Sequence, residues 1–204
     1  MTELVLATRN RHKGDELTAL LGDLGIRIRT LDDFPDAPEV EEDGLTCEAN
    51  AVKKATEISR ATGLTAVADD TGLEVDALGG RPGVYAARYA GEGATYEDNC
   101  RKLIQELSGV PREQRTARFI TVAAIVVPGE PAQVAHGALE GYITDAPVGS
   151  RGFGYDAVFY VPELGTTLAE ISAEQKNRMS HRAKAFLQAK EVLRARQSES
   201  IVGA

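Results

Sequence analysis

The segment from residue 66 to residue 89 reads AVADDTGLEVDALGGRPGVYAARY, and the fold and function of the chain can be interpreted outward from it. Its first apolar residues predict the end of a buried strand, and Asp69 and Asp70 follow directly. We expect Thr71 and Gly72 to turn the chain there. Two adjacent carboxylates at a strand end can present oxygens to a hard cation or to a water molecule. A lone acidic pair is more often simply solvated, so the other segments must decide between these interpretations.

The composition indicates a soluble globular protein. The chain has 204 residues, 43% of them hydrophobic and 26% charged, which suits one large domain or two small lobes. Its formal net charge of −8 disfavours binding to nucleic acid or to anionic membranes. The apolar run from Leu4 to Ala7 is too short for a signal peptide or a membrane span, so we expect a cytoplasmic protein. Residues 197–204 are expected to be frayed.

A polar segment, Thr8 to Lys13, follows this first predicted strand and leads into a helix predicted from about His12 to Leu24. The free N–H groups and the dipole of a helix N-terminus favour phosphate, and Lys13 adds a positive charge. The chain has no G-x-x-x-x-G-K-[ST] motif, so this is not a P-loop. Taken alone, Arg9, Arg11 and Lys13 are more often a solvated basic edge than a phosphate site.

An acidic run that includes Glu42 precedes a helix predicted from about Thr46 to Thr62. Carboxylates at this position often do no more than stabilise the helix N-terminus. The run could also supply one more ligand to a metal held at Asp69 and Asp70. Lys53 lies in the first two turns of the same helix and could contact phosphate.

The two cysteines, Cys47 and Cys100, are far apart in the sequence and form no C-x-x-C motif. Two cysteines in a chain of this size do not make a disulfide framework. Both fall in predicted helices, where we expect them to be small buried hydrophobic residues.

The last third of the chain contains a second unusual segment, GFGYD at 152–156. Glycines allow close approach of the backbone, and an exposed Phe is a stacking surface for a base. Downstream, a capping box at 172–175 opens a short helix that carries Lys176. The last helix begins at Ser180-His181-Arg182, where His181 and Arg182 are donors near a loop, although either could be part of an ordinary hydrophilic helix start.

Five segments, taken in order along almost the whole chain, carry a resemblance to a known family. They are VLATRN with Lys13, EEDGLT with Glu48, Asn50 and Ala51, ADDTGLEVDALGGRPGVYAARYAG, GFGYDAVF, and AEISAEQKNRMSHRAKA. Each segment alone is weak evidence. Together they resemble the inosine triphosphatase family, the non-standard purine nucleoside triphosphate pyrophosphatases.

This resemblance implies a single inosine-triphosphatase-like domain over residues 1–204, with two lobes and no linker. It implies an α/β fold on a long twisted mixed β-sheet flanked by helices, with a nucleotide cleft between the lobes. Family members are magnesium-dependent homodimers that hydrolyse ITP, dITP and XTP to the monophosphate and diphosphate. They thereby keep deaminated purines out of DNA and RNA.

The resemblance also assigns roles to individual residues. Glu42 and Asp70 match the metal-binding carboxylates, Asp70 also matches the proton acceptor, and Asp69 is a further possible ligand. The residues expected to bind the substrate are Thr8, Arg9, Asn10, Arg11, His12, Lys13, Lys53, Thr71, Phe153, Gly154, Tyr155, Asp156, Lys176, His181 and Arg182. Four residues depart from the commoner family pattern. Arg9 stands where many members have Gly, Cys47 where Phe is usual, Thr71 where Ser is usual and Ala157 where Pro is usual.

Two alternatives to this function remain. The first is a related pyrophosphatase for other modified triphosphates, which a substrate panel would distinguish. The second is a sensor that binds a nucleotide without cleaving it. The set of Glu42, Asp69, Asp70 and Lys13 disfavours a sensor, because a sensor needs no carboxylate to activate water. From the residues alone, either Asp69 or Asp70 could be the base, and only the family match selects Asp70.

Overall fold

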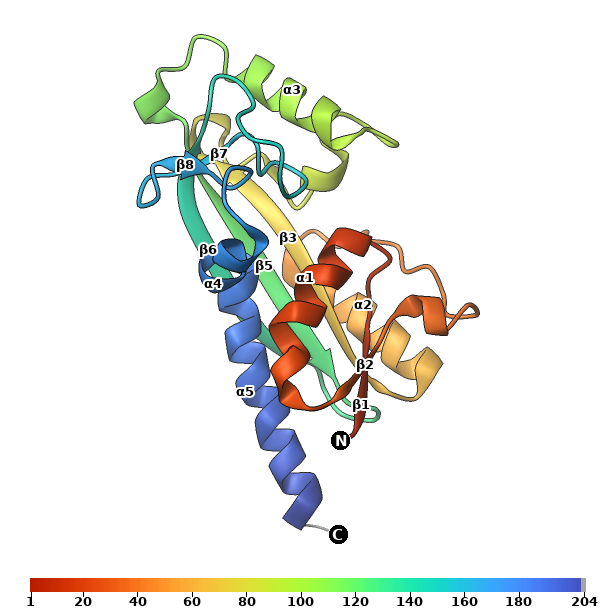
Figure 1. The fold of residues 1–204 in the computed structure, drawn as a ribbon. Helices are drawn as coiled ribbons and strands as arrows, with labels where there is room; N and C mark the ends of the chain where they lie inside the picture. Colours follow the sequence, from red (N-terminus) through yellow and green to blue (C-terminus); the bar gives the residue numbers. More distant parts are fainter. Residues whose placement is uncertain (203–204) are drawn as a thin grey trace. The chain divides into compact units, whose positions relative to one another are not determined.

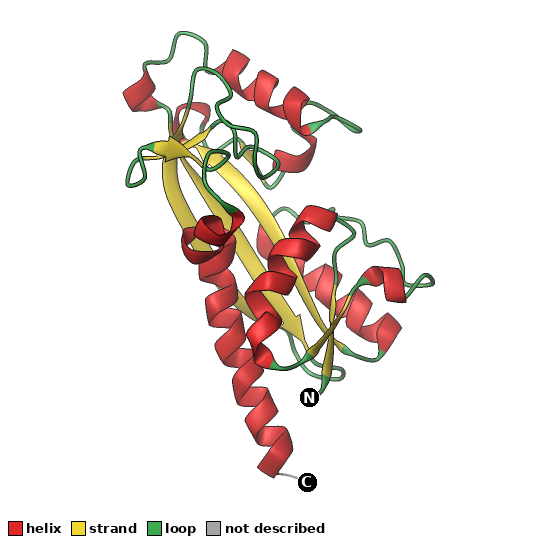
Figure 2. Ribbon diagram, viewed as in Figure 1, coloured by secondary structure: helices red, strands yellow, loops and turns green. Residues whose placement is uncertain are grey.

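The structure, a computed structural model, describes residues 1–202 of the chain. It is a mixed α/β fold in which helices flank a mixed sheet (Figures 1 and 2), as the resemblance implied. The last helix continues to Val202, so the predicted fraying is wrong up to that residue, and residues 203–204 lie outside the described part. In chain order the main elements are β1 (Glu3–Leu6), α1 (Arg11–Leu21), β2 (Arg27–Arg29), α2 (Cys47–Thr62), β3 (Thr65–Val75), β4 (Pro82–Gly83), α3 (Tyr96–Glu106), β5 (Thr116–Val126), β6 (Gln133–Ile143), β7 (Phe159–Val161), β8 (Thr166–Thr167), α4 (Ala173–Met179) and α5 (His181–Val202).

The sheet has eight strands in the order β2-β1-β3-β5-β6-β7-β8, and β4 pairs with β3 outside this path. The strands β2 and β3 each pair with β1 in parallel. The pairs β3–β4, β6–β7 and β7–β8 are antiparallel. The sheet is therefore mixed.

The helix ends follow the capping residues that the sequence offers. Thr46 caps α2 by accepting a hydrogen bond from the backbone N–H of Ala49. Capping boxes open α3 at Thr95 and α4 at Ser172, the second as predicted. After α2, Gly63 adopts a φ of 68°, a left-handed conformation that glycine reaches without strain.

The chain divides into two compact units. Unit 1 comprises Met1–Asp70, Thr121–Gly137 and the chain from Arg182 onward, and unit 2 comprises Thr71–Ile120 and Ala138–His181. The strands β3, β5 and β6 each contribute residues to both units. The organisation predicted for residues 1–204, one domain with two lobes, stays a prediction.

Unit 1 has a hydrophobic cluster on each face of its part of the sheet. Leu4 and Leu6 of β1 belong to one cluster, and Val5 belongs to the other, because successive side chains of a strand point to opposite faces. The first cluster includes residues of α1 and α5, and the second includes residues of α2. Figure 1 accordingly shows α1 and α5 on one side of the strands and α2 on the other. This explains why β1 is apolar at three successive residues, Leu4 to Leu6.

The connections of unit 1 create a switch point beside β1. The chain passes from β1 through α1 to β2 on one side of β1, and then through α2 to β3 on the other side. Ligands of open α/β sheets bind outside the carboxyl ends of the strands at such a point. The pairing of β1 with β3 ends at Leu6 and Val67, so the residues next in line are the Thr8–Lys13 segment and the Asp69–Asp70 pair.

Unit 2 has its own hydrophobic core. This core contains one residue each from three strands, Leu73 of β3, Phe119 of β5 and Phe159 of β7. They pack with Leu103 of α3 and with Leu107, the residue that follows this helix. These contacts pack α3 against the sheet through the apolar face of the helix.

The structure corrects one prediction in the opening segment. The sequence predicted a turn at Thr71 and Gly72, but β3 runs without interruption to Val75. The acidic pair therefore lies in the middle of a strand. Asp69 can be buried there because positively charged side chains surround it, so a polar pair need not end the strand.

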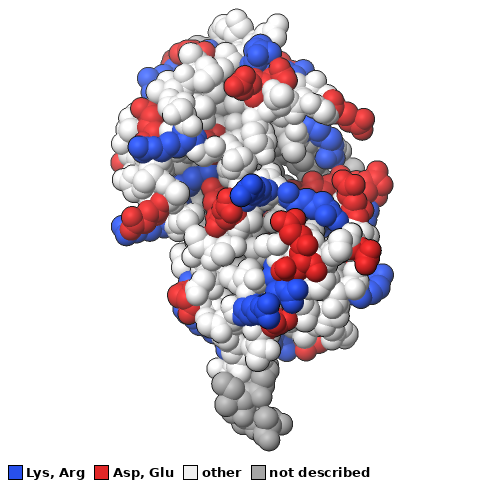
Figure 3. Space-filling view, turned by 45° about the vertical axis from the view of Figure 1, so that its right-hand side comes forward, with Lys and Arg blue, Asp and Glu red and all other residues white. Residues whose placement is uncertain are grey.

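On the face shown in Figure 3, acidic and basic side chains are interspersed, and neither sign forms a continuous area. Among residues 1–202, no helix is long and apolar enough to cross a membrane.

Candidate functional site

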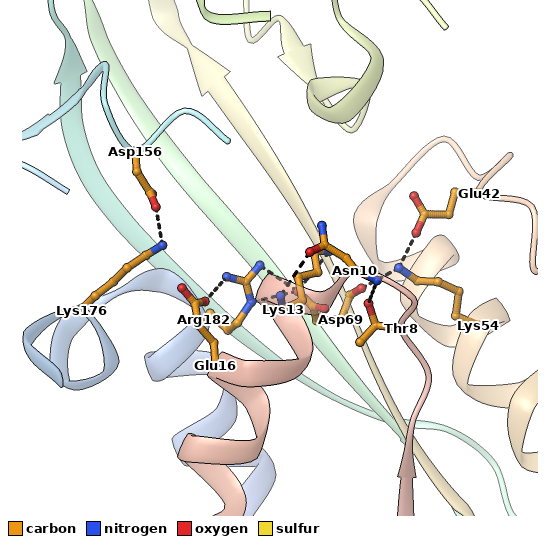
Figure 4. A network of polar contacts seen from close by, with 10 residues as sticks. All are labelled: Thr8, Asn10, Lys13, Glu16, Glu42, Lys54, Asp69, Asp156, Lys176 and Arg182. Carbon is orange, nitrogen blue, oxygen red and sulfur yellow. Dashed lines mark hydrogen bonds and ion pairs between the residues drawn. The ribbon is translucent and has the colours of Figure 1, made fainter. Parts of the chain in front are cut away.

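Asp69 is the centre of a buried ion network in unit 1 (Figure 4). Its Oδ2 accepts hydrogen bonds from the Nε and Nη2 atoms of Arg182, each at 3.1 Å, and lies 3.4 Å from the Nζ of Lys13. Burial favours the neutral form of Asp69, but the charges of Lys13 and Arg182 outweigh it and hold the pKa of this carboxyl well below its usual range. Asp69 is therefore an anion at neutral pH.

The pKa of Asp70, the next residue, is shifted in the opposite direction. Its Oδ2 accepts a hydrogen bond of 3.1 Å from the side-chain amide of Asn50, in α2. Burial raises the pKa of Asp70, and the negative charge of Glu42 contributes in the same direction. A raised pKa makes a carboxylate a stronger proton acceptor, so Asp70 is the better base of the pair.

Lys54 joins the acidic loop to β3. Its Nζ donates to Glu42 Oε1 at 2.5 Å and to the backbone oxygen of Asp69 at 2.6 Å. Burial lowers the pKa of Lys54, but Asp69 and Glu42 more than compensate, and the net shift is upward. Glu42 is subject to the reverse balance, because burial raises its pKa while Lys54 lowers it overall. The two groups form a charged pair at neutral pH.

The Thr8–Lys13 segment forms the N-terminus of α1, as predicted. Asn10 is the N-cap residue, and its Oδ1 accepts a hydrogen bond of 3.3 Å from the backbone N–H of Lys13. Thr8 Oγ1 in turn accepts from the backbone N–H of Asn10 at 3.2 Å. Burial lowers the pKa of Lys13, and the neighbouring Lys54 and Arg182 lower it further, while Asp69 opposes them. The structure thus concentrates positive charge at a helix N-terminus, which suits an anionic ligand.

Arg182 is 2% exposed and belongs to the same network. Besides Asp69, it bonds through Nη1 to Glu16 Oε2 of α1 at 2.6 Å. Its guanidinium thus connects α1, β3 and the start of α5 within unit 1. The position of this arginine is set by two carboxylates.

In unit 2, the 152–156 segment forms a compact turn around Asp156. Asp156 Oδ2 accepts a hydrogen bond of 2.9 Å from the backbone N–H of Phe153 and pairs with the Nζ of Lys176 at 2.5 Å. Lys176 Nζ also lies 4.7 Å from the centre of the Phe153 ring, a cation–π contact. Gly152 must be glycine, because its φ is +72° and an added Cβ would lie 2.1 Å from Asp156 Oδ2.

His181 is 2% exposed, and its ring stacks on Phe119 with 4.4 Å between the centroids and 20° between the planes. The sequence suggested a donor near a loop, and the structure places the ring in the buried part of unit 2 instead. The packed ring fixes the orientation of both ring nitrogens.

The predicted site residues thus fall into three groups. Those gathered in the network of unit 1 are Thr8, Asn10, Lys13, Glu42, Asp69, Asp70 and Arg182. Those gathered in unit 2 are Phe153, Gly154, Tyr155, Asp156, Lys176 and His181, with Thr71 placed in β3 next to Asp70. Arg9, Arg11 and His12 are exposed at the start of α1, and Arg9 bonds through Nη2 to the backbone oxygen of Ala37 at 2.8 Å. Lys53 pairs at 2.7 Å with Asp43.

Sequence reasoning missed three residues that the structure places in the network of unit 1. Lys54 rather than Lys53 directs its ammonium to the carboxylates, Asn50 bonds to Asp70, and Glu16 bonds to Arg182. Helical periodicity could have identified Lys54. It lies three residues after Ala51 and four residues from both Asn50 and Ile58, and therefore on the buried side of α2. Glu16 carried no such signal, because its partner is 166 residues away in the sequence.

In the part of the chain that the structure describes, no group of three or more His, Cys, Asp or Glu side chains is close enough to hold a metal ion. Mg²⁺ does not require such a group, because it commonly binds one or two carboxylates and completes its shell with water and substrate phosphates. Glu42 and Asp70, which repel each other electrostatically, are a donor pair of this kind.

The fold and this centre define a class: a mixed α/β protein with lysines and buried carboxylates at a helix N-terminus and at a switch point of its sheet. The chain belongs to the Ham1 family, whose family model matches residues 4–192. It is 52% identical over 203 residues to a dITP/XTP pyrophosphatase of Geobacillus kaustophilus, covering 100% of this chain and 97% of that one. It is 53% identical over 186 residues to a dITP/XTP pyrophosphatase of Geobacter sulfurreducens, covering 91% and 94%.

Solved structures agree with this assignment. A HAM1 protein from Coxiella burnetii superimposes with a TM-score of 0.85 at 40% identity, over 95% of this chain and 98% of that one. The mixed α/β fold and the family that the sequence segments indicated are thus confirmed.

Proposed function

We propose that this protein is a nucleoside triphosphate pyrophosphohydrolase that hydrolyses dITP, ITP and XTP to the monophosphate and diphosphate. The names of the relatives, at about half identity over the whole chain, support this assignment. The observation that carries it is the adjacent pair Asp69 and Asp70, in which one carboxylate anchors cations and the other has a raised pKa. Removing dITP, ITP and XTP keeps deaminated purines out of nucleic acids.

In the proposed reaction, a water molecule attacks the α-phosphorus, and the bond from that phosphorus to the bridging oxygen breaks. Diphosphate leaves with the bridging oxygen, and Asp70 accepts a proton from the water. Lys13 and Lys54 stabilise the charge on the triphosphate, since both ammonium groups are fixed by carboxylates in advance. Asp69 orients Lys13 and Arg182 rather than binding a metal, because these two cations already contact its Oδ2.

Mg²⁺ is the proposed cofactor, held by Glu42 and Asp70. When bound, it would neutralise charge on the phosphate oxygens. Thr8 to Lys13 are the proposed main contacts of the triphosphate, and Lys53, whose ammonium is paired with Asp43 at the exposed edge of α2, is a peripheral one. We add Lys54 to these proposed contacts, because its ammonium donates a hydrogen bond to Glu42, one of the two proposed metal ligands.

Base selection is proposed to depend on hydrogen bonds to the six-position of the purine. Hypoxanthine and xanthine have an oxo group there, which is an acceptor, whereas adenine has an amino donor. A donor from His181, Arg182 or nearby backbone would be left unpaired by adenine, which can discriminate by orders of magnitude. Phe153 would stack on the base, and Thr71, Gly154, Tyr155, Asp156 and Lys176 complete the proposed substrate set.

The test is incubation of the protein with ITP, XTP, ATP or GTP and Mg²⁺, with diphosphate and orthophosphate measured separately. We expect diphosphate from ITP and XTP and at least about 100-fold lower efficiency with ATP. Orthophosphate as the first product would exclude attack at the α-phosphorus. Equal efficiency with ITP and ATP would exclude the proposed selection of the base.

The functional form is proposed to be a homodimer in the cytoplasm, without nucleic acid or membrane as a partner. The resemblance is the support for the dimer, and the net charge of −8 disfavours polyanionic partners. Sedimentation equilibrium at micromolar concentration measures the subunit number directly, and a monomer would exclude the dimer.

A further inference from the structure

Unit 2 contains a cavity of about 700 Å³ between α3 and the segment 145–157. Its walls include Tyr96 and Cys100 from α3, and Phe153 and Asp156 from the 152–156 turn. Clefts that bind small molecules have volumes of about 300–1,000 Å³ and are lined mainly by apolar and aromatic groups, with a few polar ones. The cavity is large enough for a heterocyclic base, and its lining also includes the charged residues Glu97, Arg101, Asp145 and Arg151.

The side chain of Phe153 is held by contacts on more than one side. Lys176 lies over its ring, and Asp156 holds its backbone N–H. The ring of Tyr96 contacts it as well, with 5.9 Å between the centroids and 45° between the planes. This tilted arrangement is one that aromatic pairs prefer. Tyr96 is thus the contact that α3 makes with the Phe153 ring.

A second contact ties α3 to the same turn. The Sγ of Cys100, one helical turn after Tyr96, lies 3.4 Å from the backbone oxygen of Gly154. Cys100 therefore holds the backbone of the turn, while Tyr96 holds the Phe153 side chain. The two residues are four apart and share one face of the helix.

The start of α3 does not itself require a tyrosine at position 96. Thr95 and Asp98 form a complete capping box and satisfy the first backbone donors of the helix. The Tyr96 side chain is 38% exposed, so it contributes little to the core of unit 2. Its packing on Phe153 is the contact that distinguishes a tyrosine from a small residue at this position.

We propose that Tyr96 is a positioning residue for base binding, which keeps the Phe153 ring in its stacking orientation through the aromatic contact from α3. This inference rests on the proposed function, which assigns Phe153 to the base. It adds α3 to the substrate-binding elements. Removing Tyr96 takes away one of the contacts that hold the Phe153 ring, so the bound base has a less fixed surface without any change at the phosphates.

The test compares Tyr96→Ala and Tyr96→Phe with Tyr85→Ala as a matched control. Tyr85 is another exposed tyrosine of unit 2, and its ring contacts Arg88 instead of Phe153. We expect Tyr96→Ala to raise KM for ITP about fivefold with kcat changed less than about twofold, and Tyr96→Phe to behave like the wild type. Inhibition by inorganic tripolyphosphate, which has no base, should be unchanged in both variants. Tyr85→Ala should change neither constant.

Phe153→Ala distinguishes the positioning role of Tyr96 from the proposed binding of the base at Phe153. If Phe153→Ala raises KM for ITP and Tyr96→Ala does not, the role of Tyr96 is overturned and the proposed function stands. If neither variant raises KM, the base is not held at Phe153, and the base site of the proposed function fails as well. If Tyr96→Ala weakens tripolyphosphate as much as ITP, its effect is a general one on the fold, and the positioning role is overturned.

Discussion

The network around Asp69 in unit 1 and the 152–156 turn in unit 2 are built from different contacts. In unit 1, Lys13, Lys54 and Arg182 are interleaved with carboxylates. In unit 2, one ion pair, Asp156 with Lys176, supports a backbone turn and an aromatic ring. The first arrangement suits a ligand of high negative charge, and the second suits a flat ring of low charge.

This difference teaches how the two regions respond to substitution. Removing one charge from a dense buried network leaves its partners unpaired, and several kcal/mol depend on each group. Removing one contact from the aromatic turn leaves the others in place. Substitutions in unit 1 should therefore act on turnover and stability, whereas those in unit 2 should act on the affinity for the base.

The largest effect is expected from Asp70→Asn. The amide keeps an acceptor for the side chain of Asn50, so the fold should be preserved. It cannot accept a proton, and we expect kcat to fall about 1,000-fold while ITP still binds. Diphosphate release and calorimetric titration with ITP measure the two parts. Retained turnover would move the base to another group, with Asp69 the first to examine.

Asp69→Asn should instead act on stability, with a loss of about 3 kcal/mol in the free energy of unfolding, because Lys13 and Arg182 lose their shared counter-ion. The pKa of Asp69 is lower in the folded state than in the unfolded chain, so its contribution is present above about pH 4 and declines as the pH falls further. Urea unfolding of both proteins at pH 7 and pH 3 measures this. A difference that does not shrink at pH 3 would contradict a lowered pKa of Asp69 in the folded state.

From the sequence alone, most of the residues in both regions could be predicted, but the contacts between their side chains could not. The order of apolar runs and capping residues predicted the first strand, α2 and the capped start of α4 closely. It failed at Thr71 and Gly72, where a polar pair suggested a strand end, because the cations that make a buried Asp69 tolerable come from other parts of the sequence. For the same reason it could not predict the partners of Arg182, since both Asp69 and Glu16 are more than 100 residues away.

The lysines of α2 offer a sharper test of the network, because they are adjacent in sequence and lie in different environments. Lys54→Met removes a buried ammonium from Glu42 and should lower kcat/KM about 100-fold. Lys53→Met removes only an exposed pair with Asp43 and should change kcat/KM less than about twofold. Steady-state kinetics with ITP measures both. A larger effect of Lys53→Met would return the phosphate-binding role to Lys53, as the sequence first suggested.

A smaller effect than those in the network of unit 1 is expected from Gly152→Ala, which disturbs the turn of unit 2 without removing any charge. The new Cβ would displace the Asp156 carboxylate from Lys176 and from the N–H of Phe153, so the ring loses two of its supports. We expect KM for ITP to rise about tenfold, with the inhibition constant of tripolyphosphate unchanged. Gly129→Ala is the matched control, because its φ of +82° is equally unfavourable for alanine but a Cβ there meets no atom within 4 Å. If both variants raise KM alike, the effect comes from backbone strain and the contrast between the two regions fails.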